Sequence, residues 1–165
     1  MFRKISIMVV CFLSILGYEN CKIYAGAEPT KSVWASLSDD QQLSMFRELL
    51  RTAGWTERLT DENSCFTLMA PTNKAILKMG NSEIIELNRT ENMDHLRSFL
   101  EKHIFPGSLI MDSLIMSETT PPSVGGKSYP VKLIRDKGSI GNAHSLKKPV
   151  YAPNGTLFVI DAVLE

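Results

Sequence analysis

The chain has 165 residues, of which 44% are hydrophobic, 22% charged and 8% aromatic, a composition typical of one globular domain. Lysine plus arginine and aspartate plus glutamate each number 18, so no net basic field would attract nucleic acid. Three cysteines are too few for a disulfide scaffold, and their spacing contains no Cys-x-x-Cys pair. These figures exclude nucleic acid as an expected partner and predict a compact domain.

The N-terminal residues have the pattern of a secretory signal peptide. Arg3 and Lys4 precede an apolar run over residues 5–16, which is shorter than the roughly 20 residues of a membrane-spanning helix. Ala25-Gly26-Ala27 fits a signal peptidase site, with Gly17 as an alternative cleavage position. We therefore expect a signal peptide over residues 1–27 and a mature domain over 28–165 that is secreted, periplasmic or extracellular, with no integral membrane segment.

Cleavage after Ala27 would remove Cys11 and Cys21 from the mature chain. The third cysteine, Cys65, lies in an apolar run. We therefore expect Cys65 to pack as a small buried apolar residue rather than to form an intrachain disulfide.

The first half of the mature chain has mainly helical patterns. Ser38-Asp39-Asp40-Gln41 has the spacing of a capping box. Apolar residues then recur at three- and four-residue intervals up to Gly54, which predicts a helix with one core-facing side: Leu43, Phe46, Leu49, Leu50 and Ala53.

A short strand over Cys65–Met69 should end at Ala70-Pro71, and Thr72 should cap a short helix that starts near Asn73. Helical spacing of apolar residues resumes at Met93 and predicts a helix that continues up to Phe105-Pro106-Gly107.

The second half has strand patterns. Apolar and polar residues alternate over 128–133, which predicts a half-buried strand. Asn154-Gly155 is a hairpin turn signal, because both residues tolerate a positive φ, and a strand should follow over 156–163. Helices come first and strands later, so the predicted class is α+β.

Three ordered blocks resemble the signatures of the fasciclin-like domain family. The blocks are Phe66–Ala75, which contains Ala-Pro-Thr-Asn, then Leu96–Gly107, which ends in His-Ile-Phe-Pro-Gly, and Asn154–Leu164. The resemblance covers roughly Val33 to Leu164. It implies a wedge of two β-sheets with about seven strands and with helices packed at one edge.

The resemblance also implies an interaction module, since animal members are adhesive and several carry an Asp-Ile pair implicated in integrin recognition. Pro149-Val150 occupy the matching positions here, followed by Tyr151. An integrin metal needs a carboxylate oxygen, which Pro149 does not have. The candidate partner-binding residues are Pro149, Val150 and Tyr151, together with Lys102 and His103. For His103, a buried hydrogen-bonding role is the alternative.

We therefore expect a secreted, non-enzymatic module that binds a surface or matrix protein or a polysaccharide. The alternative is an extracytoplasmic carrier of a small ligand, with a pocket between sheets and helices near Lys102, His103 and Tyr151. The sequence does not indicate an oligomeric state.

The three histidines lack metal-ligand spacing, and the sequence contains neither a nucleophile elbow nor a phosphate-binding glycine loop. We expect no catalytic, metal or cofactor site. Asn88 and Asn154 each begin an Asn-x-Thr sequon and would be glycosylation sites in a eukaryotic secretory pathway. The alternative is that both asparagines are turn and cap residues.

Overall fold

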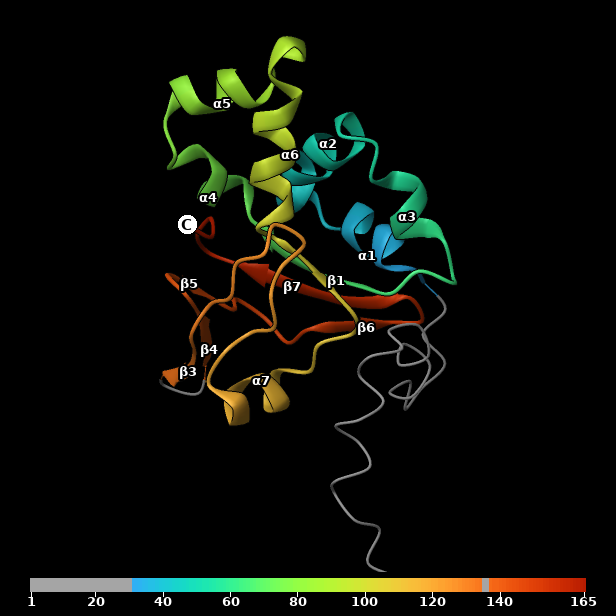
Figure 1. Cartoon of the computed structure of the whole chain (residues 1–165), viewed down its shortest axis with the longest axis vertical. Coiled ribbons are helices and arrows are strands. Elements are labelled where there is room, and N and C mark those ends of the chain that lie inside the picture. Colours follow the sequence, from blue (N-terminus) through green and yellow to red (C-terminus); the bar gives the residue numbers. More distant parts are fainter. Residues whose placement is uncertain (1–30, 135–136) are drawn as a thin grey trace, which may run out of the picture.

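The computed structural model describes residues 31–134 and 137–165. Figure 1 shows helices α1 to α6 gathered on one side of a central sheet, with a smaller sheet and α7 on the other side. The expected signal peptide, its cleavage site at Ala27 and the alternative at Gly17 lie outside the described residues.

The helices are short. The α-helices are α1 (Val33–Asp39), α2 (Ser44–Thr52), α3 (Thr56–Thr60), α4 (Asn73–Leu77), α5 (Asn81–Leu87), α6 (Met93–Glu101) and α7 (Met111–Ser117), and two 3-10 turns, η4 (Gln41–Leu43) and η5 (Thr90–Asn92), precede α2 and α6. Helices of this length gain most of their stability from tertiary packing rather than from intrinsic propensity.

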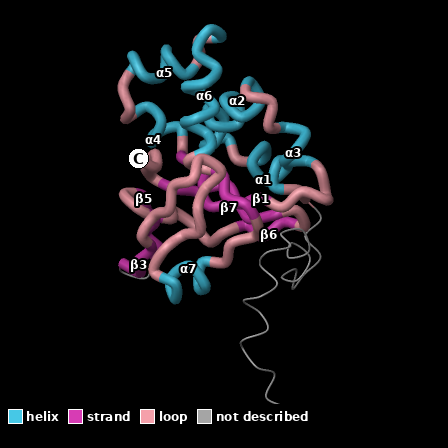
Figure 2. Tube along the Cα trace, viewed as in Figure 1, coloured by secondary structure: helices cyan, strands magenta, loops and turns pink. Residues whose placement is uncertain are grey.

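Within the described residues, seven strands form two sheets, which Figure 2 shows in magenta. They are β1 (Phe66–Pro71), β2 (Ile104–Pro106), β3 (Val131–Ile134), β4 (Lys137–Ile140), β5 (Ala143–His144), β6 (Val150–Ala152) and β7 (Gly155–Ile160). The four-stranded sheet has the order β2-β1-β7-β6 and the three-stranded sheet the order β3-β4-β5. The α+β class and the two-sheet architecture with helices to one side are confirmed.

The centre of the larger sheet pairs distant parts of the chain. β1 runs parallel to β7, with Phe66 opposite Gly155 and Pro71 opposite Ile160. All six residues of β7 are buried. Because successive residues of a strand face opposite sides, Leu68 and Ala70 of β1 belong to the core under the helices and Met69 to the core between the sheets.

The first fasciclin-like block makes local contacts that fix α4 and α2. Thr72 is the N-cap of α4, where its hydroxyl accepts a hydrogen bond from the backbone N–H of Ala75. The carboxamide of Asn73 accepts from the backbone N–H of Met45 at 2.9 Å and donates to the Ser44 hydroxyl at 2.9 Å. The predicted strand end and cap are therefore confirmed, and Asn73 has a structural role.

Two predicted helix boundaries are wrong. Ser38 lies inside α1, and the residue that caps the next turn is Asp40, whose carboxylate accepts from the backbone N–H of Gln42. The later helix ends at Glu101 rather than near Gly107, because Ile104–Pro106 pairs with β1 as strand β2. Helical spacing within one segment carries no information about such a distant pairing.

The expectation for Cys65 is also wrong. Cys65 is half-buried rather than buried, and it is disulfide-bonded. The other two cysteines of the chain, Cys11 and Cys21, lie outside the described residues.

Candidate functional site

Strand β6 presents two of the expected partner-binding side chains to solvent. It is the last strand of its sheet and pairs antiparallel with β7, with Val150 opposite Leu157 and Tyr151 opposite Thr156. Val150 and Tyr151 are each 37% exposed, whereas the preceding Pro149 is half-buried. The structure therefore places both exposed side chains on an edge strand, where successive residues face opposite sides of the sheet.

The Tyr151 side chain lies beside the start of α7. Partial burial raises the pKa of its phenol, and the charge of Asp112 acts in the same direction, while a backbone hydrogen bond with Met111 opposes both. The phenol is therefore neutral at physiological pH. It offers a partner an apolar ring face together with one hydroxyl.

The segment before β6 is held in place by specific contacts. The backbone N–H of Leu146 donates to the carbonyl of Val159 at 2.8 Å, and the Ser145 hydroxyl donates to the carbonyl of Lys147 at 2.9 Å. The Lys147 ammonium pairs with Asp40, and this hydrogen bond lowers the pKa of the Asp40 carboxyl. β6 is thus presented on an ordered support.

The turn after β6 is fixed by Asn154. Its carboxamide oxygen accepts from the backbone N–H of Val33 at 2.9 Å, and its nitrogen donates to the carbonyls of Leu59 at 2.8 Å and Asp61 at 3.3 Å. Asn154 is 2% exposed. A glycan on this nitrogen is incompatible with those contacts, so the structure supports the turn-and-cap role for Asn154.

His103 does not share a surface with β6. Its ring is fully buried, its Nδ1 bonds to the carbonyl of Phe99 at 2.8 Å and its Nε2 bonds to the backbone N–H of Leu164 at 3.0 Å. Both ring nitrogens are thus used within the domain, which is the buried role given as the alternative. Lys102 is half-buried at the C-cap of α6. The expected ligand pocket around Lys102, His103 and Tyr151 is therefore wrong, since His103 cannot reach a ligand.

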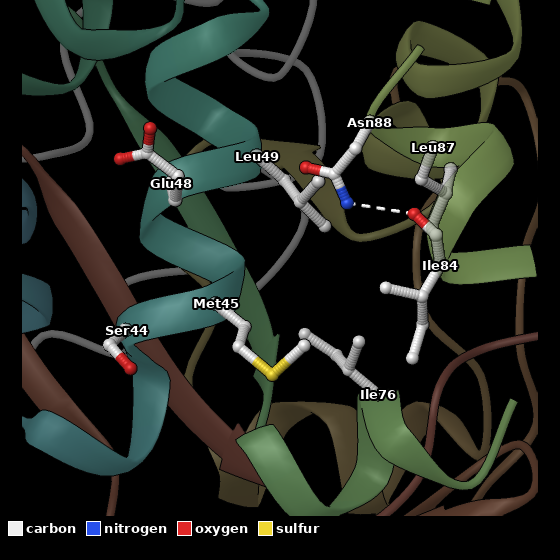
Figure 3. Close-up of a pocket in the computed structure, with 8 residues that line it drawn as sticks. All are labelled: Ser44, Met45, Glu48, Leu49, Ile76, Ile84, Leu87 and Asn88. Carbon is white, nitrogen blue, oxygen red and sulfur yellow. Dashed lines mark hydrogen bonds between the residues drawn. The ribbon is translucent and has the colours of Figure 1, made fainter. Parts of the chain in front are cut away.

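A pocket of about 250 Å³ lies instead among the helices (Figure 3). Met45 and Leu49 of α2 face Ile76 of α4 and Ile84 of α5 across it. The remaining lining residues are Ser44, Glu48, Leu87 and Asn88. Asn88 is exposed and donates from its side chain to the carbonyl of Ile84 at 2.7 Å, so its expected role as a glycosylation site stays a prediction.

Sequence reasoning missed this pocket. It assigned Leu49 to the core and gave Ile76 and Ile84 no role, because the pocket forms only where three separate helices meet. The structure shows two large apolar residues that are more than half exposed on the helices around this pocket: Leu77 on α4 and Ile85 on α5.

Within residues 31–134 and 137–165, no group of three or more His, Cys, Asp or Glu side chains could hold a metal ion. None of the helices described for this chain is long and apolar enough to span a membrane.

The chain matches one family model and is similar to two known proteins. Residues 41–165 match the model of the Fasciclin domain. Protein sll1483 of Synechocystis sp. is 26% identical over 140 residues, which are 85% of this chain and 76% of that protein. A FAS1 domain pair from the insect cell adhesion molecule Fasciclin I has a similar fold, with a TM-score of 0.75 and 22% identity over 83% of this chain. This chain spans about half (51%) of that domain pair.

Proposed function

Because this chain belongs to the fasciclin domain family, whose members are adhesion-type modules, we propose that it is a secreted, non-enzymatic module that binds a cell-surface or matrix partner. The partner is a protein or a polysaccharide, and β6 is the contact surface. The signal-peptide pattern of residues 1–27 supports export.

The observation that carries this proposal is the exposure of Val150 and Tyr151 on an ordered edge strand. An edge strand offers backbone groups as well as side chains to an incoming partner. The contacts of Leu146 and Lys147 already order the approach to β6, so binding would not have to order this segment. Preorganisation of this kind reduces the entropic cost of association.

The small-ligand carrier remains a second candidate, and the pocket of Figure 3 is the observation for it. Its volume of about 250 Å³ is below the range of roughly 300–1,000 Å³ that is typical of small-ligand sites. Native mass spectrometry of the protein purified from its source would support a carrier only by showing a stoichiometric bound mass.

The test of β6 is retention at the cell surface or matrix in cells that produce the full chain. We expect Val150→Glu to reduce retention about tenfold, because a charge would be buried at the contact. Ile85→Glu is the matched control, since it makes the same kind of change at an exposed apolar residue on α5, away from β6. Equal retention of both variants and the natural chain would show that β6 is not the contact surface.

A further inference from the structure

We propose that the edge strand β3 binds an extended partner peptide in which acidic and apolar side chains alternate, so that the peptide becomes a fourth strand of the three-stranded sheet. The inference goes beyond the proposed function and does not depend on β6. It rests on the outward-facing backbone groups of β3 and on the different side chains that β3 presents on its two faces.

The outer edge of β3 has backbone groups that point away from the sheet. β3 is the first strand in the order β3-β4-β5 and pairs antiparallel with β4. The backbone N–H of Val131 points away from β4, because it donates to the carbonyl of Glu118, the C-cap of α7, at 2.8 Å. Backbone groups alternate in direction along a strand, so the N–H and C=O of Leu133 point to the same outer side. In the part of the chain that the structure describes, no strand pairs with this side, and Leu133 can bond to an added strand.

One face of β3 is apolar and lies against α7 (Figure 1). Val131 and Leu133 share this face, because side chains alternate along a strand. A Cβ at Gly138, which is opposite Leu133 on β4, would collide with the Met111 side chain of α7, so α7 packs on this face. Both β3 residues line a groove together with Ile115 of α7. The other lining residues are Glu118, Pro130 and Lys132. Leu133 is 55% exposed in this groove and offers a contact to an apolar side chain of the peptide.

The opposite face of β3 and β4 has two exposed lysines. Lys132 directly precedes Leu133 and therefore faces the other side of the sheet, and Lys137 is opposite Ile134 on that same side. Among the described residues, neither lysine forms an ion pair. A carboxylate on the added strand would supply a countercharge for Lys132. A peptide that matches both faces must therefore alternate acidic and apolar residues.

A second copy of this chain is a poor match for the same edge. Antiparallel pairing of two β3 strands would bring the lysines of both copies onto one face of the joined sheet. Lysine on an edge strand is a common device that prevents such pairing. The charge on this face thus favours an acidic partner over self-association.

Fluorescence anisotropy of a short labelled peptide that alternates valine and glutamate tests the proposal on the exported natural protein. We expect saturable binding with a Kd below about 1 mM and slower hydrogen exchange at the Leu133 N–H in the complex. A peptide of the same length that alternates valine and lysine should bind at least about tenfold more weakly, because its charges repel those of β3 and β4.

Two variants separate the contribution of charge from that of the backbone. Lys132→Glu should weaken binding of the glutamate peptide at least about tenfold and strengthen binding of the lysine peptide. Lys74→Glu is the matched control, since it makes the same change at an exposed lysine on α4, away from β3 (Figure 1). Leu133→Pro removes the outward N–H and should also weaken binding at least about tenfold, and proline is tolerated at such an edge position. Urea unfolding checks that each variant is folded, and hydrogen exchange in the natural protein replaces Leu133→Pro if that variant is not.

An absence of saturable binding, equal binding of the two peptides, or equal losses in Lys132→Glu and Lys74→Glu would overturn the proposal. Binding that needs Lys132 but leaves the exchange at Leu133 unchanged would also overturn it, because it would show attraction of any polyanion, such as an acidic polysaccharide. Self-association that Leu133→Pro abolishes would instead assign the edge to a second copy. Val150→Glu should bind the peptide as the natural chain does, so a failure at β3 is distinguishable from a failure at β6.

Discussion

The Nε2 atom of His103 accepts a hydrogen bond from the backbone N–H of Leu164 at 3.0 Å, which joins the end of α6 to the C-terminal residues. Nε2 can accept only when Nδ1 carries the proton, and Nδ1 then donates to the carbonyl of Phe99. The ring also packs against Phe46 and Phe99, with centroid distances of 5.7 and 4.9 Å. The fold therefore requires the neutral form of this histidine.

Stability should fall as pH falls from about 6.5 to 4, because burial lowers the pKa of His103 from 6.5 to about 4. In this window the unfolded chain binds a proton at His103 that the folded chain does not. The stabilisation is complete above pH 6.5 and is lost progressively towards pH 4, by about 3 kcal/mol in total. Urea unfolding at several pH values measures this slope.

His103→Gln should remove this part of the slope and cost about 2 kcal/mol at pH 7, because buried backbone partners lose their bonds. His95→Gln changes a histidine that bonds to Glu83 on the surface, and it should keep the slope. The same pH dependence in the natural chain and His103→Gln would contradict the assignment.

Gly155→Ala should destabilise the domain by about 3 kcal/mol or more. A Cβ at this position would lie 1.8 Å from the carbonyl oxygen of Phe66, and the φ of Gly155 is +147°. The parallel β1 and β7 pair could not close around the added methyl group without moving its backbone. The urea unfolding midpoint measures the loss.

Gly125→Ala is the matched control, because its Cβ would meet Glu101 at an ordinary distance of 3.4 Å. We expect a change within about 0.5 kcal/mol for this variant. If the two alanine variants are equally stable, close packing does not explain Gly155.

These contacts show what the sequence could predict. The hairpin between β6 and β7 was predicted and is confirmed, since it depends on residues close in sequence. The predicted helix face of Leu43, Phe46, Leu49, Leu50 and Ala53 is confirmed for the three residues inside α2, whereas Leu43 is buried in η4 and Ala53 is the half-buried C-cap. The prediction that Asn154 and Gly155 form the turn by taking a positive φ is only partly right. Gly155 does have a positive φ, but Asn154 does not and is instead held by its buried carboxamide.

Non-local features could not be read from local patterns. The parallel pairing of Phe66 with Gly155 and the strand at Ile104–Pro106 depend on segments far apart in the chain. The position of β6 as a candidate site came from the family resemblance, and its exposure came from the structure. The helix pocket depends on how Met45, Ile76 and Ile84 meet in space.

The ion pair between Asp40 and Lys147 should contribute about 0.5–1 kcal/mol, because the Lys147 side chain is nearly half exposed and solvent weakens the pair. A double-mutant cycle with Asp40→Asn and Lys147→Met measures the coupling, and added salt should reduce it. Asp40→Asn keeps a capping side chain for Gln42, whereas Asp40→Ala should cost about 1 kcal/mol more.

The lowered pKa of Asp40 sets the pH dependence of this pair. The stabilisation is present above the unfolded carboxyl pKa of about 3.9 and is lost as pH falls through the lower folded value. A coupling energy of zero at low salt and neutral pH would show that the pair does not hold the segment before β6.

The disulfide of Cys65 gives a test of the signal peptide. Besides Cys65 the chain contains only Cys11 and Cys21. Cleavage after Ala27 removes both, whereas cleavage after Gly17 keeps Cys21 in the mature chain and allows a disulfide within one molecule. We therefore expect the exported protein to begin at Tyr18. Its intact mass should rise by about two mass units on reduction, because a disulfide accepts two hydrogens.

An intact mass that corresponds to a chain starting at Glu28 would support the predicted cleavage after Ala27. The Cys65 disulfide would then have to join two molecules, and non-reducing electrophoresis would show a dimer that Cys65→Ser abolishes. A protein that begins at Glu28 and migrates as a monomer with a reactive thiol would contradict the disulfide altogether. The mature N-terminus and the state of Cys65 thus constrain each other, because the cysteines that could complete the bond lie on either side of the Gly17 cleavage position.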